Sequence, residues 1–194
     1  MTLSQPWDEQ QFQGLKKAFL ESLRLRFTIA HAVEQDLRRA EELTVRTNQL
    51  NATGKIYGYD ELKTFLDSPR HELIVCTLED RYGSHGKVGL ALMEITPESY
   101  HLRLFLFSCR VVSLGVGSVL LTHVLQRAHE NGKTVKADFI HTGPNRQSFV
   151  AFRLAGFVET GAAENGTLVL EHRAELVQPY PPYVHLTLPE TTKG

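Results

Sequence analysis

LFSCRVVSLGVGSVLLTHVLQRA, residues 106–128, begins with the pattern of a buried strand and ends with the pattern of a helix. Cys109, Gly115 and Gly117 lie at the junction, and apolar residues then recur at helical spacing as far as Ala128. A strand that turns into a helix at glycines is typical of mixed α/β folds. The segment raises two questions: whether the glycines bind a ligand, and whether the cysteine reacts.

The flanking sequence predicts one α/β domain with a mixed, mostly antiparallel sheet flanked by helices. We expect a lead-in segment and helix over 1–23, the domain itself over 24–175 and a tail over 176–194. The periodicity predicts helices over 12–23, 33–51, 59–68, 116–132 and 145–154, and strands over 24–32, 71–82, 87–95, 99–112, 134–142, 157–161 and 167–172.

Composition excludes several classes of protein. The net charge is −1, from 21 Lys and Arg against 22 Asp and Glu, so the basic footprint of a nucleic-acid binder is missing. Apolar runs are far shorter than the roughly 20 residues that span a bilayer, which argues against a membrane protein. Only two cysteines occur, each in an apolar run, which favours a reducing, cytoplasmic setting. No Cys or His spacing typical of a metal site is present.

The order of elements resembles the acyl-CoA N-acyltransferase (GNAT) fold. In that fold a glycine turn and the following helix N-terminus hold the pyrophosphate of coenzyme A. The resemblance predicts the same role for Gly115, Val116, Gly117 and Ser118. These residues would bind coenzyme A or a phosphopantetheine arm transiently. A plain tight turn remains the alternative, since Val112 stands where the GNAT pattern has Gln or Arg.

Cys109 ends the central strand, the edge at which open α/β sheets place their chemistry. The neighbouring Arg110 and the positive end of the next helix favour the thiolate, which is the nucleophilic form. The alternative is that Cys109 only packs, because free cysteine behaves as a small hydrophobe. Cys76, in the middle of an apolar strand, is interpreted as a core residue.

Two polar clusters are candidate binding segments. Thr47, Asn48, Gln49 and Asn51 follow the first domain helix, where they either end the helix or hold a small polar acyl group. The segment 141–149 leads from a strand into a helix. Its Asn145 is either an N-cap or a contact for the pantetheine arm, and His141 is a candidate substrate contact or base.

Five segments together resemble the C-terminal half of FkbH-like proteins, the glyceryl-loading enzymes of polyketide biosynthesis. They are AEELTVRTNQLNATG, LEDRYGSHGKVGLAL, FLFSCRVVSLGVGSVLL, FIHTGPNRQSFVAFRLAGF and QPYPPYVHL. The resemblance implies a glyceryl group carried as a thioester on Cys109 and passed to the phosphopantetheine thiol of an acyl carrier protein. It also implies a HAD-like phosphatase half, but this sequence has no Asp-x-Asp motif, so a phosphatase domain or protein is an expected partner.

Two other functions remain open at this stage. An acetyl-CoA-dependent N-acetyltransferase would use the same fold, with Cys109 as packing only. A non-catalytic module that docks a carrier protein would bind its partner without acyl turnover. Activity that survives Cys109→Ala is the mark of the first alternative, and tight partner binding without turnover is the mark of the second.

Overall fold

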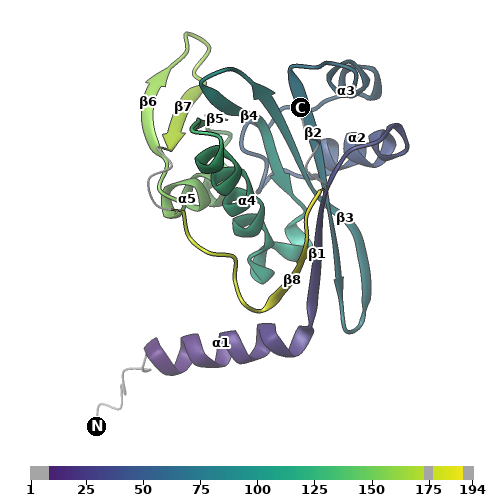
Figure 1. The fold of residues 1–194 in the computed structure, drawn as a ribbon, viewed down its shortest axis with the longest axis vertical. Helices are drawn as coiled ribbons and strands as arrows, with labels where there is room; N and C mark the ends of the chain where they lie inside the picture. Colours follow the sequence, from purple (N-terminus) through teal and green to yellow (C-terminus); the bar gives the residue numbers. More distant parts are fainter. Residues whose placement is uncertain (1–8, 173–176, 190–194) are drawn as a thin grey trace.

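The computed structural model describes residues 9–172 and 177–189. In this part of the chain the strands form one eight-stranded sheet in the order β6-β7-β5-β4-β3-β2-β1-β8, with helices on both faces (Figure 1). The elements are α1 (Glu9–Leu23), β1 (Leu25–His31), α2 (Leu37–Arg46), α3 (Tyr59–Leu66), β2 (His71–Asp80), β3 (Gly83–Ile95), β4 (Ser99–Phe107), α4 (Val116–Glu130), β5 (Thr134–Phe139), α5 (Arg146–Leu154), β6 (Val158–Ala162), β7 (Leu168–His172) and β8 (Val184–Thr187), with short 3-10 helices η1 (Glu34–Asp36) and η2 (Cys109–Leu114).

The predicted order of helices and strands is confirmed, with three differences. The strand expected over 99–112 ends at Phe107, because the chain winds into η2 and Val111 packs into the core there. The helix expected over 33–51 ends at Arg46, and the polar residues after it form a turn. The predicted tail contributes β8, which pairs with β1 in parallel. The predicted domain boundaries themselves stay a prediction.

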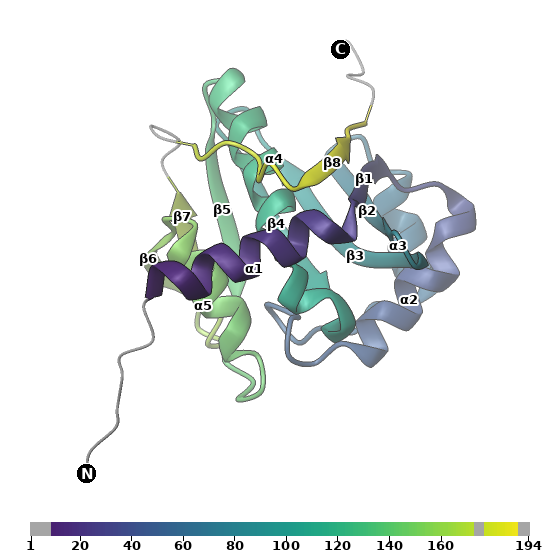
Figure 2. The same ribbon diagram turned by 90° about the horizontal axis from the view of Figure 1, so that it is seen from below.

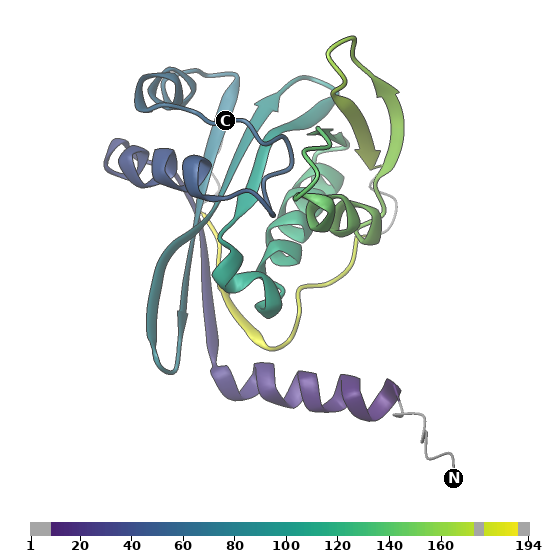
Figure 3. The same ribbon diagram turned by 180° about the vertical axis from the view of Figure 1, so that it is seen from behind.

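The sheet separates two apolar cores. The larger one, which we call the α4 face, lies under α4 and α5 and contains Phe105, Phe107 and Phe152 (Figure 1). The smaller one, the α2 face, lies under α2 and α3 and contains Leu104 and Leu106 (Figure 3). Neighbouring residues of β4 thus point to opposite faces, as the pleat of a strand requires. Helix α1 crosses the lower end of the fold (Figure 2).

Strands β4 and β5 are parallel neighbours that pair over only part of their length. Their ladder runs from Ser99–Thr134 to Leu102–Ala137 and then stops. The register between β3 and β4 shifts at the same level, between Leu92 and Met93. A bulge of this kind bends a strand and increases its twist, so β4 diverges from β5 beyond Leu102. The divergence opens a gap in the sheet next to Phe105 and Phe107.

No helix in the described ranges 9–172 and 177–189 has both the length and the apolar character needed to cross a bilayer.

Candidate active site

The gap between β4 and β5 is filled by the chain's own residues 50–52. The amide of Phe107 donates to the carbonyl of Leu50 (3.0 Å), and the amide of Ala52 donates to the carbonyl of Phe105 (3.0 Å). On the other side, the amide of Ile140 after β5 donates to the carbonyl of Ala52 (3.0 Å). We call residues 50–52 the seal, because they satisfy backbone groups of both diverging strands.

Asn145 locks the seal in place. Its side-chain nitrogen donates to the carbonyls of Asn51 (3.0 Å), Ala52 (3.2 Å) and Ile140 (2.8 Å), and its side-chain oxygen accepts from the amide of Thr142 (3.1 Å). Asn145 stands at the N-cap position of α5 but makes no side-chain capping bond. Only 1% of it is exposed, so its amide serves the fold, and its predicted contact with a pantetheine arm would have to replace these bonds.

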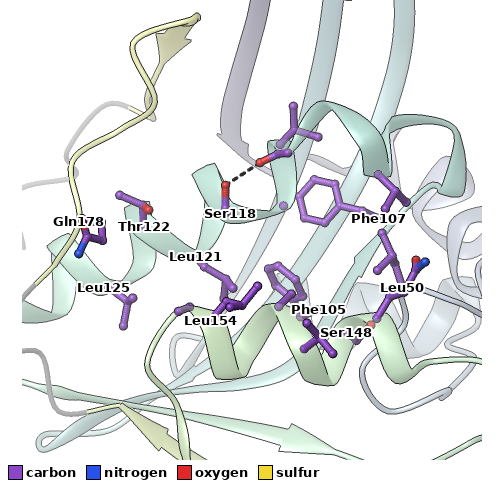
Figure 4. Close-up of a pocket in the computed structure, with 18 of the residues that line it drawn as sticks. Leu50, Phe105, Phe107, Ser118, Leu121, Thr122, Leu125, Ser148, Leu154 and Gln178 are labelled. Atoms are coloured by element: carbon purple, nitrogen blue, oxygen red, sulfur yellow. Dashed lines mark hydrogen bonds between the residues drawn. The ribbon is translucent and has the colours of Figure 1, made fainter. Parts of the chain in front are cut away.

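A cavity of about 810 Å³ lies on the α4 face, between α4 and α5. Its floor is formed by Phe105 and Phe107, and Leu50 of the seal closes one end (Figure 4). Leu121 and Leu125 of α4 face Leu154 of α5 across it, while Gln178 of the C-terminal segment lies at the far end from Leu50. A largely apolar cavity of this size is typical of a small-molecule site.

The close packing under the floor explains one glycine. A Cβ atom on Gly89 of β3 would lie 2.4 Å from the ring of Phe107. Only glycine at this position lets the ring of Phe107 lie against β3 and keep its place under the cavity. This glycine was not singled out by the sequence analysis, because its role depends on the register of β3 against β4.

The predicted glycine junction lies at the mouth of the cavity, whose lining includes Gly115, Val116, Gly117 and Ser118. Gly115 adopts the left-handed conformation (φ 72°) that ends η2 and starts α4, which a residue with a side chain rarely adopts. The hydroxyl of Ser118 donates to the carbonyl of Gly115 (2.7 Å). The amides of Val116 and Gly117 belong to the first turn of α4, where an α-helix supplies no acceptor of its own.

The C-terminal segment 177–189 covers the outer side of α4 and helps to wall the cavity. Pro179 and Pro181 are among the lining residues. The hydroxyl of Tyr183 lies 2.9 Å from the place that a Cβ on Gly115 would occupy, so Gly115 also allows this close approach. The sequence analysis treated this segment as a tail and missed its part in the site.

The two cysteines differ sharply in environment. Cys76 is fully buried in β2, and burial raises the pKa of its thiol far above the ordinary value, so it is inert packing. Cys109 is exposed at the start of η2, two residues beyond Phe107 of the cavity floor. Cys109 therefore lies beside the rim of the cavity and is not part of its lining.

The fold brings the first predicted polar cluster next to Cys109. The amide of Phe107 donates to the carbonyl of Leu50, which joins the two segments. Asn48 and Gln49 lie within two residues of Leu50, and Cys109 lies two residues after Phe107. Asn48 and Gln49 are exposed, as are Cys109 and Arg110. The structure thus brings together the chain segments that carry Asn48, Gln49 and Cys109.

The remaining predicted residues serve the fold or lie apart from the cavity. Thr47 is buried at the end of α2. Asn51 is also buried: its side-chain oxygen accepts from the amides of Thr53 (3.2 Å) and Gly54 (3.0 Å), and its nitrogen donates to the carbonyl of Lys55 (3.0 Å). His141 is exposed and packs edge-on against Phe139, outside the cavity lining.

Charged side chains cluster instead on the α2 face of the diverging strands. Arg103 donates to Glu94 (2.6 Å) and to Asp138 (3.1 Å), and His101 bonds the same Asp138 (2.8 Å). The hydrogen bond from Arg103 lowers the pKa of Glu94. Burial raises the pKa of Asp138, but the bonds from His101 and Arg103 outweigh burial and lower it. Sequence reasoning missed this cluster, because its members come from three strands.

The α4 face contains two buried histidines that are neutral at pH 7. Burial lowers the pKa of His123 on α4 to about 4, and also lowers the pKa of His172 on β7, which lines the cavity. His123 Nδ1 contacts the hydroxyl of Tyr180 (3.3 Å), while its Nε2 has no partner within the described residues. His123 thus packs as a core residue, although only one of its two ring nitrogens has a partner within the described residues.

Comparison with known proteins identifies the fold. No family model and no curated protein matches the sequence. Solved structures do match: the ribosomal-protein-S18-alanine N-acetyltransferase from Escherichia coli has a TM-score of 0.60 at 13% identity, covering 80% of this chain and 98% of that chain. A domain from Methanocaldococcus jannaschii reaches 0.62 at 15% identity, covering 76% of this chain and 98% of that chain. A spermidine N-acetyltransferase from Vibrio cholerae has a TM-score of 0.54 at 18% identity, covering 75% of this chain and 91% of that chain.

The fold is therefore that of the GNAT acyltransferases, as the order of elements predicted. At these identities the likeness establishes the fold and leaves the substrate to the chemistry of the site.

Proposed function

We propose that this protein is an acyltransferase that takes its acyl group from a thioester on a pantetheine arm. The observation that carries the proposal is the cavity between α4 and α5, whose lining includes Val116 and Gly117 of the first turn of α4 beside largely apolar walls. Helix N-terminal amides suit a phosphate group, and the apolar interior suits the uncharged arm. The arm belongs either to coenzyme A or to a carrier protein.

Cys109 relays the acyl group in this proposal. Its thiolate attacks the thioester carbon, a new carbon–sulfur bond forms, and the donor sulfur leaves as a thiolate that takes up a proton. The reverse sequence passes the acyl group to the next pantetheine thiol. Because both bonds are thioesters of similar energy, supply of the donor sets the direction.

The finer part of the proposal is a glyceryl group delivered to an acyl carrier protein, as the FkbH-like resemblance implies. The exposed amides of Asn48 and Gln49 near Cys109 suit an acyl group that carries hydroxyls. A HAD-like phosphatase domain or protein would prepare the donor. An N-acetyltransferase reaction with acetyl-CoA is the competing function, favoured by the proteins that share the fold.

Intact-protein mass spectrometry separates the two functions. Wild type, Cys109→Ala and Cys76→Ala are each incubated with glyceryl-loaded acyl carrier protein or with acetyl-CoA. We expect a glyceryl adduct on the wild type and on Cys76→Ala, and no adduct on Cys109→Ala. Acetyl transfer to an added amine at equal rates in all three proteins, with no adduct on any of them, would contradict the relay and favour the N-acetyltransferase.

A further inference from the structure

Three chain segments that meet around Cys109 contain basic residues but no acidic ones. They are residues 44–57, 104–120 and 139–158. The backbone bonds of the seal join the first segment to the other two. The side chain of Ser148 on α5 also donates to the carbonyl of Gln49. The absence of acidic residues is therefore a property of three joined segments.

The basic side chains of this region are exposed and unpaired. We call Arg46, Lys55, Arg110 and Arg146 the basic rim; all are exposed, and none forms an ion pair within the described residues. Elsewhere most partly buried cations are paired: Arg39 with Glu42, Lys63 with Asp67, Lys87 with Asp36, Arg103 with Glu94 and Arg127 with Glu72. An unpaired, single-sign surface in a chain of net charge −1 points to an external partner.

The rim is wider than the mouth of the cavity. Arg146 lines the cavity and Arg110 follows Cys109, whereas Arg46 ends α2 and Lys55 follows the seal, both on the side of the α2 face. Exposed Val150 and Leu154 of α5 also line the cavity and are 45% and 84% exposed. Apolar side chains bordered by charge are typical of a protein interface.

We propose that the basic rim is the docking surface for an acidic protein domain that presents the thioester on its pantetheine arm. This inference rests on the proposed function, since the rim surrounds the site that the arm would enter. Opposite charge steers such an encounter and orients the partner, so that the arm points towards the cavity and Cys109. The rim then decides which donor is used, while the cavity and Cys109 perform the transfer.

The test compares a carrier-bound donor with a free donor. One is glyceryl-phosphopantetheine on an acidic acyl carrier protein, and the other is free glyceryl-pantetheine. The variant is Arg46→Glu combined with Lys55→Glu, two exposed residues that do not line the cavity. The matched control is Arg70→Glu, an exposed arginine between α3 and β2 outside the rim. The readout is the rate of adduct formation on Cys109 at several salt concentrations.

We expect the double variant to lose about tenfold or more of its rate with the carrier-bound donor at low salt, with a weaker salt dependence. The rate with free glyceryl-pantetheine and both rates of Arg70→Glu should match the wild type. Equal losses with both donors, or no loss with the carrier, would overturn the docking proposal. Tighter binding of a duplex oligonucleotide than of the carrier would also overturn it. No adduct on the wild type from either donor would instead contradict the proposed function.

Discussion

The two faces of the sheet carry opposite chemistry over the same strands. On the α4 face, Phe105 and Phe107 of β4 form the floor of an apolar cavity. On the α2 face, His101 and Arg103 of the same strand join a network of ion pairs with Asp138 of β5. The strand ladder separates the faces as far as Leu102, and beyond it the seal does so.

This difference shows how the fold keeps most charge away from the cavity, whose described lining contains one charged side chain, Arg146. The charged groups of the diverging strands neutralise one another behind the sheet, and the histidines on the cavity side are held neutral by burial. The exposed cations of the basic rim lie around this cavity and form no ion pair within residues 9–172 and 177–189. A thioester in the cavity would therefore meet walls that are neutral apart from Arg146, whereas an approaching partner would meet cations.

The largest effect is expected from opening the seal between the faces. Asn145→Ala removes three donated hydrogen bonds and one accepted bond, two of them buried and two partly buried, and leaves backbone groups without partners. We expect a loss of roughly 3 to 4 kcal/mol in the free energy of unfolding, measured by urea denaturation. Asn48→Ala, at an exposed position, should change it by less than about 0.5 kcal/mol. Equal values for the two variants would show that the seal contributes nothing.

A smaller effect is expected from protonating the neutral face. The pKa of His123 is about 4 in the folded protein against a reference value of 6.5, so the unfolded chain binds the proton first as the pH falls. The free energy of unfolding therefore has its full contribution from neutral His123 above pH 6.5, and this contribution is lost as the pH falls towards 4. Between pH 7 and pH 5 we expect the loss of about 2 kcal/mol from the free energy of unfolding.

Urea denaturation at the two pH values measures this loss. His123→Leu should lack that part of the pH dependence, whereas His141→Leu, at an exposed position, should keep it. A His123→Leu protein with the full wild-type dependence would contradict the assignment.

The smallest effect is expected on the charged face. The lowered pKa of Asp138 means that its ionised form stabilises the fold above the reference value of 3.8, and that this contribution is lost as the pH falls through the lower folded value. Asp138→Asn should therefore lower the free energy of unfolding by about 1 kcal/mol at pH 7. The difference in this free energy between the variant and the wild type should shrink below pH 3.8. A difference that grows on acidification would contradict the network. Urea denaturation across this range provides the measurement.

The sequence predicted the fold better than the site. Periodicity located every α-helix of the described residues and most of their strands, since burial of one face imposes a 3.6-residue or 2-residue repeat. It missed β8, a short strand of alternating exposure in a proline-rich segment, and it extended β4 into η2, because Val111 is apolar in either conformation. Local pattern does not distinguish these cases.

Site residues were predictable where backbone conformation demands a residue type. Gly115 was identified because glycines mark the strand-to-helix turn, which the structure shows to be left-handed at this residue. The uses of Asn51 and Asn145 were not predictable, because polar side chains look alike whether they bind a ligand or the backbone, and one partner of Asn145 lies 94 positions away. The seal, the ion pairs behind it and the basic rim depend on which segments the gap between β4 and β5 brings together.

The most direct test of the central claim is to map the binding of coenzyme A by amide chemical shifts in the ¹⁵N-labelled protein. If the cavity on the α4 face holds the pantetheine arm, shifts should concentrate at Gly115–Ser118 and along α5, while α2 and α3 stay unchanged. Shifts confined to α2 and α3, or no saturable shifts at all, would contradict the assignment of the cavity as the site of acyl transfer.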